Sequence, residues 1–70
     1  MGETAEYLKG KKRVDEIFEE AKKYRNEHGY KENLGYDQQP ALNDYLYSLN
    51  LTYAQQSEII DYFYVKMNQI

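Results

Sequence analysis

The spacing of apolar residues is the feature that most constrains the fold of this 70-residue chain. Between Thr4 and His28 these residues recur at intervals of three and four, which places them on one face of a helix. The members of this stripe are Val14, Ile17, Phe18, Ala21, Tyr24 and His28. Thr4 is a suitable N-cap, and Gly29 is a suitable left-handed C-terminal cap. The pattern therefore predicts a long N-terminal helix.

Gly10 is the weak point of this predicted helix. An interior glycine costs about 0.5 to 1 kcal/mol relative to alanine. We therefore expect the residues before Lys11 to fray or to form a separate turn.

The second half of the chain predicts two shorter helices. Asp37 can cap the first of them, because Pro40 then lies in the first turn, where its missing N–H leaves no unpaired donor. Its apolar face comprises Ala41, Leu42, Tyr45, Leu46 and Leu49, and Asn50 suits a left-handed stop. Thr52 and Gln55 form a capping box for the last helix, from Tyr53 to about Asn68. That helix should bury Ile59, Ile60, Phe63 and Met67.

The connection from Tyr30 to Gln39 lacks sustained periodicity and predicts a loop. It carries three large apolar groups, Tyr30, Leu34 and Tyr36, so we expect it to pack back over the helices. Residues 1–70 are thus expected to form one small all-α, three-helix domain. Its parts are a long N-terminal helix, a loop, and a C-terminal helical hairpin or helix-turn-helix-like pair.

The composition argues against several kinds of chemistry. The chain has no cysteine and a lone His28, which leaves no thiolate or imidazole cluster for a metal. It also lacks a Gly-rich phosphate loop, and neither Ser48 nor Ser57 has a histidine nearby in sequence to act as a base. Glu16, Glu19 and Glu20 are interpreted as part of a solvated helix face. We expect a protein that is not an enzyme and has no cofactor or metal.

The N-terminal sequence and the length of the apolar runs bear on where in the cell the protein is expected. The N-terminal sequence is charged and contains no apolar segment typical of a secretory signal, and no apolar run is long enough to cross a bilayer. A cytoplasmic protein without membrane contact is therefore expected. High usage of Lys, Glu, Asn, Tyr and Ile is typical of an AT-rich genome and suits a short phage or mobile-element protein.

Residues 45–60 resemble a helix-turn-helix motif, in which the second helix reads DNA. The resemblance rests on Leu46, Leu49, Asn50, Leu51, Thr52, Ile59 and Ile60. It implies that Tyr53, Gln55 and Gln56 contact nucleic acid, with Lys9, Lys12 and Arg13 as phosphate contacts. Two departures from the motif disfavour this alternative: Gln56 occupies a position where such motifs usually bury an apolar side chain, and the reading helix carries Glu58 and Asp61 without a cation before Lys66. The formal charge of −3 also disfavours binding to DNA.

Nine tyrosines favour a different function. A tyrosine ring suits surfaces that are half buried and half wet, including docking faces. Tyr62 and Tyr64 lie about 200° apart around a helix, so the last helix is apolar on more than one side. We therefore expect a protein-interaction module, either a homodimer or an adaptor or inhibitor of another protein. Its predicted interface residues are Tyr47, Tyr53, Tyr62, Tyr64 and Met67.

Overall fold

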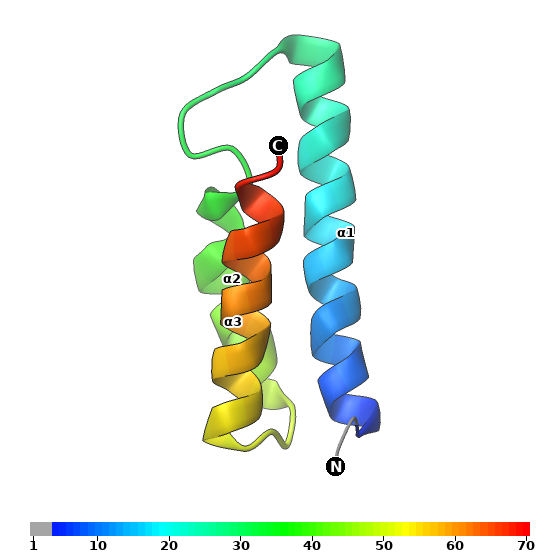
Figure 1. Cartoon of the computed structure of the whole chain (residues 1–70), viewed down its shortest axis with the longest axis vertical. Helices are drawn as coiled ribbons and strands as arrows, with labels where there is room; N and C mark the ends of the chain where they lie inside the picture. Colours follow the sequence, from blue (N-terminus) through cyan, green and yellow to red (C-terminus); the bar gives the residue numbers. More distant parts are fainter. Residues whose placement is uncertain (1–3) are drawn as a thin grey trace.

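The computed structural model describes residues 4–70 and contains three α-helices (Figure 1). Helix α1 spans Ala5–His28, α2 spans Gln39–Ser48 and α3 spans Tyr53–Met67. A 3-10 turn, η1, spans Tyr36–Gln38 and leads directly into α2. Figure 1 shows that α1 and α3 run in the same direction while α2 runs antiparallel to both. The predicted all-α, three-helix fold is confirmed.

All three helices contribute to one core. Its buried members are Val14, Ile17, Phe18, Leu42, Leu46, Ile59, Phe63 and Met67. These residues recur at the spacings that defined the predicted stripes, because one apolar face of each helix turns inward. The stripe of α1 is buried only as far as Ala21, and both Tyr24 and His28 are exposed. Ala41 is also exposed, and Ile60 is only half-buried.

Gly10 does not weaken α1 as predicted. The helix begins at Ala5 and continues through Gly10, which is buried. A Cβ atom at this position would lie 2.5 Å from Cδ1 of Ile59 and 3.0 Å from Cδ2 of Leu46. The expectation of fraying was wrong because the missing side chain lets α1 approach the other two helices closely.

Two predicted helix starts are confirmed by hydrogen bonds. The Thr4 hydroxyl accepts from the Tyr7 backbone N–H at 3.2 Å. At α3, the Thr52 hydroxyl accepts from the Gln55 N–H at 3.1 Å, and the Gln55 side chain accepts from the Thr52 N–H at 3.0 Å. Each bond satisfies a donor that the first turn of a helix leaves free. Pro40 lies in the first turn of α2, as predicted.

Three other predicted helix ends differ. Gly29 has the expected positive φ of 84°, but its ψ of 176° is extended, so the chain leaves α1 without a left-handed turn. Asp37 lies within η1, and Gln38 precedes α2 instead. Asn50 has no positive φ, because α2 ends at Ser48 and the chain is already extended at Leu49.

The loop after α1 folds back over the end of α3. Leu34 is buried, and Tyr36 packs against the core and donates from its hydroxyl to Oδ1 of Asn68 at 2.7 Å. Gly35 lies directly against the Met67 sulfur with a φ of 85°. The predicted packing of this segment is confirmed for Leu34 and Tyr36. Tyr30 is 68% exposed, so it does not take part.

Candidate functional site: the groove between α2 and α3

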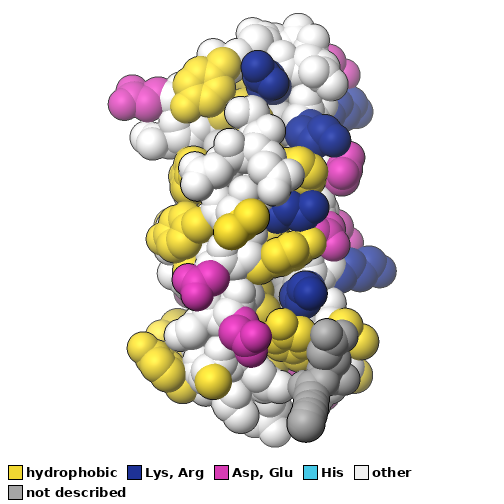
Figure 2. Space-filling model, viewed as in Figure 1, with side chains coloured by type: hydrophobic (Ala, Val, Ile, Leu, Met, Phe, Trp, Pro, Cys, Tyr) yellow, Lys and Arg dark blue, Asp and Glu magenta, His cyan; other side chains and the backbone are white. Residues whose placement is uncertain are grey.

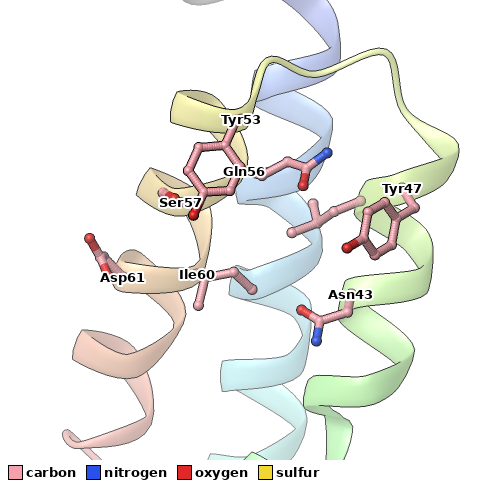
Figure 3. A pocket seen from close by; sticks show the side chains of 8 residues that line it. Asn43, Tyr47, Tyr53, Gln56, Ser57, Ile60 and Asp61 are labelled. Carbon is pink, nitrogen blue, oxygen red and sulfur yellow. The ribbon is translucent and has the colours of Figure 1, made fainter.

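A groove separates α2 from α3 on the side of the pair opposite α1 (Figure 3). It has a volume of about 340 Å³. We call it the α2–α3 groove, and its lining residues are Asn43, Leu46, Tyr47, Tyr53, Gln56, Ser57, Ile60 and Asp61. Residues three or four positions apart share one side of a helix. The lining residues of α2 therefore lie on one side of that helix, and those of α3 lie on the facing side of the other. In Figure 3, Asn43 and Tyr47 of α2 face Gln56 and Ile60 of α3 across the groove.

The floor of the groove is apolar and its edges are aromatic. Leu46 is buried and Ile60 is half-buried. Tyr47 is 76% exposed and Tyr53 is 85% exposed. Within residues 4–70, neither of these tyrosines has a hydrogen-bond or ring partner. Two large rings thus stand in water beside an apolar floor.

Beyond the lining residues, at the end farthest from the α2–α3 turn, a hydrogen bond joins α2 to α3. Gln39, one turn before Asn43, donates from Nε2 to the Tyr64 hydroxyl oxygen at 2.7 Å. The Tyr64 ring lies 6.0 Å from that of Tyr36 and 5.8 Å from that of Phe63, measured between centroids. Tyr64 is therefore held in place, although 40% of it remains exposed.

Tyr62 lies on the opposite side of α3, against α1. Its hydroxyl donates to Oδ1 of Asp15 at 2.6 Å. That hydrogen bond, followed by burial and by the negative charge of Asp15, raises the pKa of Tyr62 to about 12. The ammonium groups of Lys11 and Lys66 lie 5.0 and 5.5 Å from the centroid of its ring. Tyr62 therefore joins two helices of the fold and does not line the groove.

Met67 is also not part of an exposed surface. Only 3% of it is exposed, because Gly35 lacks a Cβ and the loop can cover the methionine closely. The predicted interface set is thus divided. Tyr47 and Tyr53 both line the groove, Tyr64 lies one turn beyond Ile60, and Tyr62 and Met67 lie elsewhere. Met67, one of the predicted interface residues, is covered by the loop in this structure.

The surroundings of the groove are acidic. Between Lys31 and Lys66 the chain has five carboxylates and no lysine or arginine. Asp61 lines the groove, while the exposed Glu58 and Asp44 lie one helical turn from Asp61 and Tyr47 respectively. In Figure 2, Lys and Arg side chains lie over α1 and along its boundary with α3. None is visible over the lower half of α3, where acidic and hydrophobic side chains lie.

The residues of the nucleic-acid alternative do not converge. Lys9, Lys12 and Arg13 line a separate groove between α1 and α2, with Glu16, Tyr45 and Leu49. Arg13 is already paired with Glu16 at 3.2 Å. The Gln55 side chain serves the capping box, whereas Gln56 faces the α2–α3 groove. The predicted cations and the predicted reading residues therefore line different grooves.

Sequence reasoning missed several lining residues of the groove. Asn43, Ser57 and Asp61 were not among the predicted interface residues, and Leu46 and Ile60 were predicted to lie in the core. The signal that could have found them is the spacing of four that joins Asn43 to Tyr47 and Tyr53 to Ser57.

Comparisons of this chain with known protein families, with curated proteins and with solved structures gave no match. In the part of the chain that the structure describes, no helix combines the length and apolarity that crossing a bilayer requires. Across the same residues, His, Asp and Glu side chains do not form a group of three or more that could hold a metal ion.

Proposed function

We propose that this chain is a small non-catalytic protein-interaction module that docks through the α2–α3 groove. It would act as an adaptor, an inhibitor or a self-associating regulator. The observation that carries the proposal is that Tyr47 and Tyr53 flank an apolar floor and have no partner among residues 4–70. Tyrosine is enriched among the residues that dominate binding energy, because it has a large rigid ring and a hydroxyl.

The chemistry of the groove supports contact with a protein. Its apolar centre, formed by Leu46 and Ile60, lies within a polar rim that includes Asn43, Gln56 and Asp61. An apolar centre with a polar rim is the usual arrangement of a protein–protein interface. Burying the two tyrosine rings there requires no favourable net charge.

Duplex DNA is the less favoured ligand for the same surface. DNA affinity comes largely from cations that contact phosphates, and the α2–α3 pair contains acidic residues without cations before Lys66. Helices of a helix-turn-helix cross steeply, whereas α2 and α3 run antiparallel (Figure 1). Both features favour the docking of a protein.

The proposal is tested by selecting binders from a displayed library of random helical peptides of about 14 residues, long enough to span the groove. The combined substitutions Tyr47→Ser and Tyr53→Ser should weaken the selected binders by about tenfold or more. Tyr30→Ser is the matched control, because Tyr30 is an exposed tyrosine on the loop. It should leave affinity unchanged.

Two measurements complete this test. Thermal unfolding should show that each serine substitution changes stability by no more than about 0.5 kcal/mol, since both rings are exposed. Binding of a random-sequence DNA duplex should be absent even at low salt. Selected peptides whose affinity is unchanged by both serine substitutions would contradict the proposal. Duplex binding that falls steeply with salt would also contradict it.

A further inference from the structure

The shape and charge of the α2–α3 groove identify the kind of partner that it fits, and this inference rests on the docking function proposed above. We propose that the groove binds an amphipathic helix of a partner protein whose flanks carry lysine or arginine. Three properties of the groove support this assignment: its position in the fold, its apolar floor and its surrounding charges.

The position of the groove favours a helix. It lies between two antiparallel helices, on the side opposite α1, which is where a fourth helix packs in a four-helix bundle (Figure 3). On α3 the lining residues run from Tyr53 to Asp61, so the groove is about 12 Å long. A helix of about three turns covers that length. The Gln39–Tyr64 hydrogen bond joins the two helices one turn beyond Asn43 and Ile60.

The apolar floor of the groove favours a partner helix that carries an apolar stripe. Leu46 and Ile60 form the floor, with Tyr47 and Tyr53 on opposite edges. A docked helix places apolar residues at intervals of three and four on such a floor. The residues that flank this stripe on the docked helix then face the edges of the groove, where the carboxylates described below lie.

Those charges favour a cationic partner. Asp61 lines the groove, and Asp44 and Glu58 lie on the outer sides of α2 and α3, one from each helix. No lysine or arginine lies between residues 32 and 65 to offset them. A second copy that docked through the same face would bring two surfaces with these same carboxylates together. Like charges that face each other across an interface oppose association, so the charges argue against a symmetric homodimer.

The inference is tested with two displayed peptide libraries of about 14 residues that share randomised apolar positions. In one library the flanking positions are Lys and Arg, and in the other they are Asp and Glu. We expect the cationic library to give binders about tenfold tighter or better, with an advantage that shrinks as salt is raised. These binders should require Tyr47 and Tyr53.

Neutralising the carboxylates in and beside the groove provides a second and more specific test of the inference. The triple variant Asp44→Asn, Glu58→Gln and Asp61→Asn should lose the preference for cationic peptides. The control variant Glu19→Gln, Glu20→Gln and Glu32→Gln alters the net charge by the same amount at exposed positions away from the groove. It should keep the preference, and circular dichroism should show that both variants remain folded.

The possible failures can be told apart. Acidic peptides that bind as tightly as cationic ones, and still require Tyr47 and Tyr53, would overturn this inference and leave the docking function intact. Self-association of the pure protein that is lost in the Tyr47→Ser, Tyr53→Ser variant would assign the groove to a second copy, which also overturns the inference alone. If neither library yields a binder that depends on the two tyrosines, both proposals are wrong.

Discussion

The two sides of α3 use the same residue types in different ways. On the side facing α1, Tyr62 donates to Asp15, and the ammonium group of Lys66 lies 4.5 Å from the centroid of the Phe18 ring. On the side facing the α2–α3 groove, Tyr53 has no such partner among residues 4–70. Helix α1 is long and charged and covers one side, whereas the shorter α2 borders the groove on the other. The comparison shows that exposure of tyrosine here depends on which helix lies opposite, and not on the composition of α3.

The largest expected effect is a difference in the free energy of unfolding between alanine variants of two adjacent isoleucines. Ile59 is fully buried beside Gly10, so Ile59→Ala should lower the free energy of unfolding by about 2 to 5 kcal/mol. Ile60 is half-buried in the groove, so Ile60→Ala should cost about 1 kcal/mol. Chemical denaturation of both variants measures the difference. Equal losses would mean that the groove side contributes to folding as much as the side facing α1.

A smaller effect is expected at Gly10, where α1 approaches the other helices. Gly10→Val should lower the free energy of unfolding by about 1 to 3 kcal/mol, because the added side chain must displace Ile59 and Leu46. Gly10→Ala should be close to neutral, since its gain in helix propensity of about 0.5 to 1 kcal/mol offsets the crowding. Lys23→Val at an exposed position of α1 controls for the low helix propensity of valine. A Gly10→Val variant no less stable than this control would refute the close approach.

The smallest effect concerns the hydrogen bond of Tyr62. Tyr62→Phe should cost about 1 kcal/mol at neutral pH, and Tyr53→Phe, which removes a hydroxyl from an exposed ring, should cost nothing measurable. The pKa of Tyr62 is raised from 10.0 to about 12, so the unfolded chain releases this proton first as pH rises. The stability from Tyr62 is therefore complete below pH 10 and is lost between pH 10 and about 12.

Denaturation at several alkaline pH values measures that loss. The decline in the free energy of unfolding over this range should be shallower in Tyr62→Phe than in the wild type. A decline of the same slope in both proteins would contradict the assignment of the raised pKa to this tyrosine.

The helices and their starts could be predicted because their signals are local. Thr4 caps a donor three residues away, and Thr52 and Gln55 cap each other within one turn. The ends of α2 were less predictable, because Asn50 and Asp37 are compatible with several turn conformations and the loop packing decides between them. Periodicity also predicted the core, since the buried face of each helix follows its apolar stripe.

The site was predicted only in part, because it depends on contacts between helices. Periodicity showed that Tyr62 and Tyr64 lie on different sides of α3, but not which side α1 would cover. Burial of Met67 depends on the close approach of Gly35, and continuity of α1 depends on the approach of Gly10 to Ile59. Such approaches between distant parts of the chain cannot be derived from spacing within one element.

The reciprocal hydrogen bonds at the start of α3 have a consequence for recognition. Tyr53 is the first residue of that helix, so its backbone is already fixed before any ligand arrives. Ordering one residue costs about 1 to 2 kcal/mol, which would otherwise be subtracted from the affinity. A partner would therefore meet a preorganised aromatic group whose remaining freedom is rotation of its own side chain.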